Sequence, residues 1–346
     1  MDGAWLEGML MSFDPGTADQ LRGVLATVAA IPVTPFGPDG QVDWEAHARL
    51  IRRIVDAGVR LVTPNGNTGE FYALTAAEAR GATESAVAAV GGTGQGRRAD
   101  VLAGVGHDLP GAIEAGRHAR DHGVRMIMVH QPVGPYMSAA GWLDYHRIIA
   151  GALPDMGIVL YLRDMRIGAR HIRLLGDLCP NVVAVKYGVG DPVRFAAVAR
   201  DAGLDRFTWL AGLAELTAPA CWTAGASGFT SGLVNVAPGL SLSLLESLRG
   251  GDTAAAMKVW DLCRPFEEMR AADSSADNVS VVKEALAQLG LCRPDVRPPS
   301  HRLSDDARAQ VATILARWGL GPAGPGRQMN PAQPGIPAVP GPGGPR

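Results

Sequence analysis

Residues 26–58, ATVAAIPVTPFGPDGQVDWEAHARLIRRIVDAG, contain the pattern that the rest of the chain repeats. An apolar, β-rich run over 26–36 precedes a stretch over 44–58 in which apolar and charged residues alternate with a helical period. The first pattern is typical of a buried strand and the second of an amphipathic helix. Gly58 stands where many helices end, just past the last helical residue. This stretch therefore predicts one strand followed by one helix.

Seven more β-rich runs follow, each with a helical stretch behind it. They cover 59–66, 99–106, 124–132, 157–162, 182–188, 207–212 and 227–232. Eight such units within about 225 residues match a (β/α)8 barrel. A doubly wound sheet is the alternative, but its first turn carries a glycine fingerprint that IPVTPFGPDG lacks. We therefore expect an α/β fold, a (β/α)8 TIM barrel with a C-terminal helical extension.

The two ends of the chain differ from this repeating part. We expect an N-terminal arm over 1–24, the barrel over 25–250, a helical region over 251–319 and a tail over 320–346. The tail is so rich in proline and glycine that it cannot form a packed core, which predicts disorder.

Composition and charge exclude several classes of protein. A net charge of −2 provides no basic surface for nucleic acid. No apolar run reaches the ~18 residues of a membrane span, and the N-terminus lacks the basic and apolar segments of a signal peptide. The four cysteines are scattered without metal-ligand spacing. We expect a cytoplasmic protein with no nucleic-acid or membrane partner.

Lys186 stands in the apolar run VVAVKYG, 182–188, and is one of only three lysines in the chain. Burial disfavours the ammonium form, lowers the pKa of the amine and frees it to attack a ketone. Arginine, which fills nearly every other basic position, effectively never loses its proton. The pattern therefore indicates a nucleophile, while an ion-paired structural lysine is the alternative that the residues alone leave open.

Polar residues follow several predicted strands at the end of the barrel where chemistry is found. Residues 66–70, GNTGE, offer small side chains and backbone N–H groups that suit a carboxylate, although an ordinary glycine-rich turn has the same composition. His130 ends the fourth run, and we expect it to contact the distal part of a substrate.

Six segments carry a resemblance to a known family. They are IPVTPFGPDGQVD, GNTGEFYALTAAE, VLAGVG, VLYLRDMRIG, VVAVKYG and GASGFTSGLVNVAP. In order and spacing they resemble the dihydrodipicolinate synthase / N-acetylneuraminate lyase family of pyruvate-dependent class I aldolases, from about residue 26 to 299. The resemblance implies a homo-oligomer, tetramer or dimer, and a Schiff-base-forming lyase that acts on pyruvate or another 2-keto acid through a lysine imine, without a cofactor.

The resemblance also implies roles for single residues. Lys186 aligns with the imine-forming lysine, and Tyr161 with the tyrosine that passes protons to and from the substrate. Thr68 and Gly69 align with the loop that holds the carboxylate of the keto acid. Arg166 falls at the position where the synthases bind a second carboxylate, and a solvent-facing arginine is the alternative.

Departures from the family pattern bear on the substrate. Asn67 replaces the threonine or serine of the synthase proton relay, so we expect it to bind substrate without relaying protons. PVGPY over 132–136 replaces PYY, and YLRD over 161–164 resembles the keto-deoxy-sugar-acid dehydratase branch. We therefore expect an aldolase or dehydratase of a 2-keto (deoxy sugar) acid. The alternatives are 4-hydroxy-tetrahydrodipicolinate synthase proper, a non-catalytic keto-acid-binding protein and a metal-dependent class II aldolase.

His118 and His122, in HARDH, have the i, i+4 spacing of two zinc ligands on one helix face. The sequence reveals no third ligand, and the glutamate of an HExxH motif is absent. A solvated helix face is therefore favoured, and we expect no metal.

Overall fold

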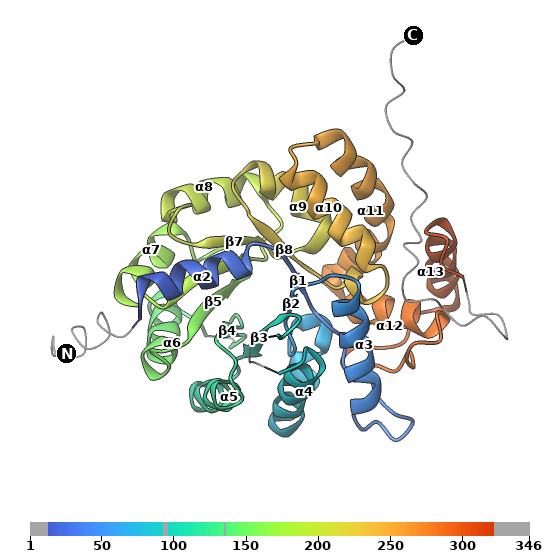
Figure 1. Cartoon of the computed structure of the whole chain (residues 1–346), viewed down its shortest axis with the longest axis horizontal. Coiled ribbons are helices and arrows are strands. Elements are labelled where there is room, and N and C mark those ends of the chain that lie inside the picture. Colours follow the sequence, from blue (N-terminus) through green and yellow to red (C-terminus); the bar gives the residue numbers. More distant parts are fainter. Residues whose placement is uncertain (1–12, 93–95, 135, 322–346) are drawn as a thin grey trace, which may run out of the picture.

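The computed structural model describes residues 13–92, 96–134 and 136–321 (Figure 1). Its eight strands are all parallel, pair in chain order and close into a barrel, because β1 pairs with both β2 and β8. The strands are β1 (Val28–Ala30), β2 (Leu61–Val62), β3 (Asp100–Val105), β4 (Met126–Val129), β5 (Gly157–Leu162), β6 (Val182–Tyr187), β7 (Thr208–Ala211) and β8 (Gly228–Ser231). Each strand lies inside its predicted run, and the predicted (β/α)8 barrel is confirmed.

A helix follows each strand and covers the outer face of the barrel. These helices are α3 (Trp44–Asp56), α4 (Ala76–Ala89), α5 (Leu109–Asp121), α6 (Ala139–Ala152), α7 (Ala169–Leu178), α8 (Pro192–Ala202), α9 (Ala214–Thr223) and α10 (Pro238–Arg249). Local capping fixes several of their starts. The Asp43 carboxylate accepts the N–H of Ala46, and Thr75 and Glu78 form a capping box at α4.

The first strand is much shorter than its apolar run of residues 26–36. Pro32 and Pro35 lack the N–H that a strand ladder needs, so the chain leaves the sheet after Ala30. Asn235, beyond β8, replaces the missing pairing: its side chain accepts from the N–H of Val33 at 3.1 Å and donates to the carbonyl of Ile31 at 2.8 Å. The loop after β1 is thereby fixed at the mouth of the barrel.

Helix α2 (Pro15–Leu25) closes the opposite end of the barrel (Figure 1). Its buried residues Leu21 and Leu25 belong to one apolar cluster with Met126 and Val183, which lie near the starts of their strands. Gly157 leaves room for this contact, because a Cβ there would lie 2.7 Å from Leu21 Cδ1. The carboxyl ends of the strands therefore form the end of the barrel that α2 leaves uncovered.

Up to residue 321, where the described part ends, three helices follow the barrel: α11 (Thr253–Ser275), α12 (Asn278–Gln288) and α13 (Asp305–Arg317). Helix α11 is interrupted at residues 272–274, which have non-helical backbone angles. Phe266, Val282 and Trp318 join the three helices in a second apolar cluster that includes Leu233 from the loop after β8. The C-terminal extension thus packs against loops at the carboxyl ends of the strands.

The domain boundaries expected at 24/25, 250/251 and 319/320 stay predictions. The Pro/Gly-rich tail expected over 320–346 lies, from residue 322 onward, outside the described residues. Among the described ranges, no helix combines the length and apolar character that crossing a membrane requires.

Candidate active site

A cavity of about 330 Å³ opens at the carboxyl ends of the strands, beneath the interruption in α11. Strands and loops of the barrel and the C-terminal helices both contribute to its wall. The polar lining residues are Asn67, Thr68, Tyr161, Arg163, Lys186, Thr230, Glu267, Arg270, Ser274, Ser275, Asn278 and Ser300. The cavity therefore brings together predicted residues and others that the sequence did not single out.

Lys186 and Tyr161 face each other at the floor of this cavity. They are directly paired in the register of β5 and β6, so both side chains point to the same side of the sheet. The Lys186 ammonium nitrogen lies 3.9 Å from the centre of the Tyr161 ring. The proposed nucleophile and proton carrier are thus neighbours.

Lys186 is only 3% exposed, and no carboxylate in the described part of the chain lies within ion-pair distance of it. Burial, together with the positive charges of Arg163 and Arg270, lowers the pKa of its amine to about 7. A large fraction of the amine is consequently neutral near pH 7, which is the form that attacks a carbonyl.

The Tyr161 hydroxyl accepts a hydrogen bond from Asn67 Nδ2 at 3.1 Å. Burial raises the pKa of this phenol, while the nearby Arg163 guanidinium acts in the opposite direction. The resting phenol is therefore protonated and oriented by an amide. Asn67 has no acidic proton to pass on, so its contribution here is to position the hydroxyl.

The loop that carries Thr68 is held by both halves of the molecule. The Thr68 hydroxyl accepts from Arg270 Nη2 at 3.2 Å and lies 3.4 Å from Asn278 Oδ1. The hydroxyl of Thr34 donates to the carbonyl of Gly69 at 2.8 Å, and a Cβ at Gly69 would lie 3.0 Å from the carbonyl oxygen of Pro32. A larger residue than glycine would therefore crowd the backbone after β1.

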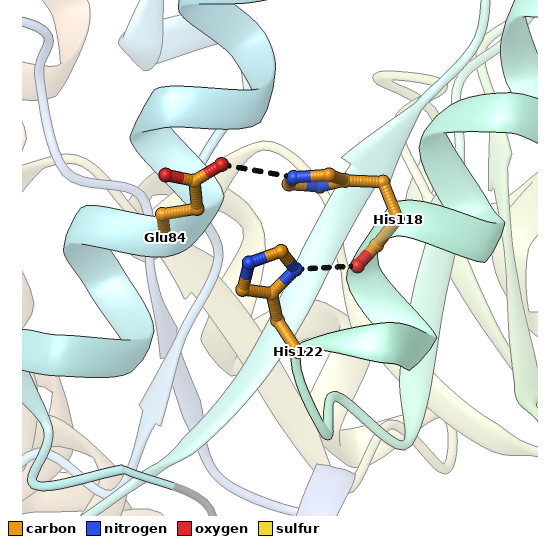
Figure 2. A group of neighbouring side chains, drawn as sticks. All are labelled: Glu84, His118 and His122. Atoms are coloured by element: carbon orange, nitrogen blue, oxygen red, sulfur yellow. Dashed lines mark hydrogen bonds and ion pairs between the residues drawn. The ribbon is translucent and has the colours of Figure 1, made fainter.

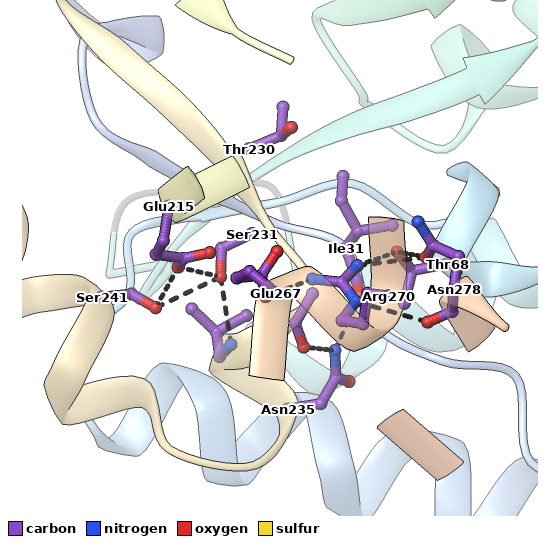
Figure 3. Close-up of polar contacts among 12 residues, drawn as sticks. Ile31, Thr68, Glu215, Thr230, Ser231, Asn235, Ser241, Glu267, Arg270 and Asn278 are labelled. Atoms are coloured by element: carbon purple, nitrogen blue, oxygen red, sulfur yellow. Dashed lines mark hydrogen bonds and ion pairs between the residues drawn. The ribbon is translucent and has the colours of Figure 1, made fainter. Parts of the chain in front are cut away.

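Arg270 reaches the cavity from α11 (Figure 3). Its Nη1 forms a buried ion pair with Glu267 at 2.6 Å, and its Nη2 donates to Asn278 Oδ1 at 3.1 Å. Gly232 makes space for it, since a Cβ there would lie 2.3 Å from Nη2. No local pattern marks Arg270, because its role depends on contacts with residues far away in the sequence.

Arg163 lines the more exposed side of the cavity and forms no ion pair within the described ranges. It lies two residues after Tyr161, and side chains two positions apart along a strand point to the same face. This spacing was the sequence signal that could have identified Arg163. Gly188, directly after β6, gives it room, because a Cβ there would lie 3.2 Å from Arg163 Cγ. Sequence reasoning selected Arg166 in this segment instead.

A second carboxylate, that of Glu215, lies on the side of Glu267 that faces away from Arg270 (Figure 3). Glu215 is fully buried and accepts from the Ser231 hydroxyl at 2.6 Å and from the Ser241 hydroxyl. Burial, followed by the negative charge of Glu267, raises the pKa of Glu215 to about 7. A protonated Glu215 leaves Glu267 as the anion that neutralises Arg270.

His130 and Arg166 do not line the cavity. His130 is buried behind Tyr161, stacks on Phe71 at 4.0 Å between ring centres, and its Nε2 donates to the carbonyl of Asn65 at 2.7 Å. Burial lowers the pKa of His130 to about 3, so the ring is neutral. The Arg166 side chain is 61% exposed and pairs with Asp164. Both were predicted to bind substrate, and neither lines this cavity.

The chain matches the model of the dihydrodipicolinate synthetase family over residues 24–317. A probable 5-dehydro-4-deoxyglucarate dehydratase from Streptomyces griseus subsp. griseus is 30% identical over 305 residues, which cover 86% of this chain and 92% of that protein. A 4-hydroxy-tetrahydrodipicolinate synthase from Bartonella bacilliformis is 28% identical over 304 residues, which cover 87% of this chain and 99% of that protein.

Solved structures give the same result. The dihydrodipicolinate synthase from Bacillus clausii superimposes with a TM-score of 0.82 at 39% identity, covering 87% of this chain and all of that one. The dihydrodipicolinate synthase from Oceanobacillus iheyensis also superimposes with a TM-score of 0.82, at 36% identity, and the match covers 87% of this chain and 99% of that one. The chain therefore belongs to the dihydrodipicolinate synthetase family and is a lyase of the class I aldolase type.

Proposed function

We propose that this enzyme dehydrates a 2-keto deoxy sugar acid that carries a second acidic group, through an imine on Lys186. The observation that carries the proposal is Arg163, a cation at the cavity wall without a carboxylate partner in the described ranges. A second acidic group on the substrate would supply that partner. Relatives named 5-dehydro-4-deoxyglucarate dehydratase support the same substrate class.

The two arginines of the cavity have different tasks in this proposal. Arg270 is already neutralised by Glu267 and hydrogen-bonds Thr68, so it organises the loop. Thr68 and the backbone at Gly69 hold the carboxylate beside the keto carbon. Arg163 is left to bind the distal acidic group. A substrate bound at both ends has its keto carbon directed toward Lys186.

The neutral Lys186 amine attacks the keto carbon, and water leaves as the iminium ion forms. The iminium withdraws electrons and acidifies the C–H bond of the adjacent carbon. Loss of that proton gives an enamine, which expels the hydroxyl group of the next carbon as water. Hydrolysis of the remaining iminium releases the product and regenerates the Lys186 amine. The Tyr161 hydroxyl is close enough to Lys186 to carry these protons, and Asn67 orients it. The imine serves as the electron sink, so the proposed reaction uses no cofactor and no metal.

Arg163→Gln tests the distal contact, with Arg166→Gln as its matched control. The two arginines lie three positions apart, but only Arg163 lines the cavity. We expect Arg163→Gln to raise KM for 5-dehydro-4-deoxyglucarate at least tenfold. Pyruvate trapping should change less, because pyruvate has no second acidic group and only the effect of Arg163 on the pKa of Lys186 is lost. Arg166→Gln should match the parent. The opposite ranking would restore Arg166 as the recognition residue and refute this assignment.

Dihydrodipicolinate synthase activity is the second candidate, favoured by the titles of the structures at 39% and 36% identity. Asn67 argues against it, because an amide cannot replace the hydroxyl of the proton relay. We expect negligible cyclic product from pyruvate and aspartate semialdehyde in a coupled assay. Efficient turnover of that pair, together with no dehydration of the keto-deoxy sugar acid, would establish the synthase instead.

A homo-oligomer, as a tetramer or dimer, and a cytoplasmic location remain part of the proposal. Val133 and Tyr136, in the segment between β4 and α6, are 67% and 98% exposed in the single chain. Such apolar exposure is typical of a surface that a neighbouring subunit covers. Light scattering of the purified chain measures the oligomeric state directly, and a monomer would contradict this part.

A further inference from the structure

Three potential metal ligands lie together on the outer surface of the barrel (Figure 2). Glu84 belongs to α4, and His118 and His122 belong to the last turn of α5 and its C-terminal cap. One ligand atom from each lies within 4.8 Å of the other two. The third ligand that the histidine spacing lacked in the sequence is therefore supplied by the neighbouring helix.

The hydrogen bonds of the cluster leave the right atoms available. His122 Nδ1 donates to the backbone carbonyl of His118 at 2.9 Å, which places the lone pair of His122 on Nε2. A backbone carbonyl on the second ring nitrogen is the usual arrangement for a metal-ligating histidine. His118 Nε2 lies 2.9 Å from Glu84 Oε1, so these two potential ligand atoms are already next to each other.

We propose that Glu84, His118 and His122 bind one Zn²⁺ or a similar divalent transition-metal ion, with water as the fourth ligand. Two imidazoles and a carboxylate suit such ions, whereas Mg²⁺ and Ca²⁺ require oxygen ligands. Tetrahedral coordination at Zn–N distances of ~2.0 Å separates neighbouring ligand atoms by roughly 3.3 Å. The Glu84 side chain is half exposed, so it can rotate to reach that spacing.

A simple surface ion pair between His118 and Glu84 is the competing explanation. It accounts for two of the side chains but not for His122, whose ring lies 4.3 Å from the His118 ring and is turned toward the same space (Figure 2). None of the three residues lines the cavity around Lys186, so the ion would join α4 to α5 and take no part in the imine chemistry. Its expected effect is on stability.

Calorimetric titration of Zn²⁺ into chelator-treated, tag-free protein tests the proposal. We expect one ion per chain, and a thermal midpoint about 4 °C higher when free Zn²⁺ is one hundred times Kd. His122→Ala and Glu84→Gln should each weaken binding at least tenfold. His301→Ala is the matched control, because His301 is an exposed histidine 3.8 Å from Asp277 and outside the cluster.

Zn²⁺ affinity in His122→Ala equal to that of the parent would overturn the site, as would an equal loss in His301→Ala. One ion per two chains would also overturn it, because the three ligands described come from a single chain. Circular dichroism of the metal-free variants separates loss of a ligand from loss of fold. Co²⁺ provides a second readout: the absorption spectrum of tetrahedral Co²⁺ should appear in the parent and disappear in Glu84→Gln if that variant is folded.

Discussion

Two lysines of this chain are buried, and they differ in what faces them. Lys186, at the barrel mouth, faces the ring of Tyr161 and has no carboxylate partner in the described ranges. Lys283, on α12, is 0% exposed, pairs with the Glu70 carboxylate and donates to the carbonyl of Asp295 at 2.8 Å. The third lysine, Lys258, is exposed.

The comparison shows that two buried lysines can have opposite electrostatic surroundings. Burial lowers the pKa of both amines, but at Lys283 the negative charge and hydrogen bond of Glu70 oppose the shift. At Lys186 the neighbouring charges are arginines, which act in the same direction as burial. Lys283 is thus held in an ion pair as a structural cation. Lys186 has no such partner, which favours its neutral amine.

The two lysines are also connected through one loop. Glu70 has a left-handed backbone conformation, with φ of 60°, at the end of the turn that carries Thr68. Its second carboxylate oxygen accepts the N–H of Arg297 at 2.9 Å. Lys283 and Arg297 therefore hold the loop whose other side forms the cavity around Lys186.

The largest effect is expected from removing the free amine. Lys186→Ala and Lys186→Arg should both lower kcat by ~10⁴-fold or more, since neither alanine nor a permanently charged arginine forms an imine. Borohydride reduction with pyruvate should add the mass of the keto acid to the parent and to Lys283→Met, but not to the Lys186 variants. Labelling that persists in Lys186→Ala would end the contrast between the two lysines.

Tyr161→Phe should give the next largest effect. It removes the phenolic proton and keeps the ring beside Lys186, so kcat should fall by ~10²- to 10⁴-fold with a smaller change in KM. Imine trapping at Lys186 should continue. Turnover close to the parent rate would assign Tyr161 to the core and remove it from catalysis.

Lys283→Met should act on stability. Removing one partner of a buried ion pair leaves Glu70 unpaired, which costs about 3–5 kcal/mol of unfolding free energy. Urea denaturation measures this loss. The double variant Glu70→Gln/Lys283→Met should recover part of it, because the uncompensated charge is gone. A stability equal to that of the parent in Lys283→Met would show that the buried pair is not a structural element.

The smallest effect concerns pH. Because the pKa of Lys186 is about 7, the rate of imine trapping should rise about tenfold per unit below pH 7 and level off above it. An unfolded lysine titrates near 10.4, so between these values the unfolded state binds more protons. The contribution of Lys186 to unfolding free energy therefore rises from pH 7 to about 10, and urea midpoints of Lys186→Met should lack this rise. A trapping rate that keeps increasing to pH 10 would contradict the lowered pKa.

Much of the fold was predictable because the signals that define it are local. Apolar runs, helical periods and capping residues such as Thr75 and Glu78 act within a few positions, and all eight strands fell inside predicted runs. The short length of β1 was not predicted, although Pro32 and Pro35 already limit how far the strand can extend.

The site was only partly predictable. Lys186, Tyr161, Asn67 and Thr68 line one cavity, as their positions at strand ends suggested, whereas His130 and Arg166 lie outside it.

What the sequence determined by itself is the alternation of strands and helices, and the apolar setting that makes Lys186 unusual. Tertiary structure alone decided which charges meet. Glu70 pairs with Lys283, 213 residues later in the sequence, and Thr68 contacts Arg270, 202 residues later. Glu84 and His118 are separated by 34 residues. The physical reason is range: hydrophobic periodicity acts along the local chain, whereas an ion pair or hydrogen bond requires two side chains within about 3 Å. Only closure of the barrel and packing of the C-terminal helices bring residues so distant in the sequence to that separation.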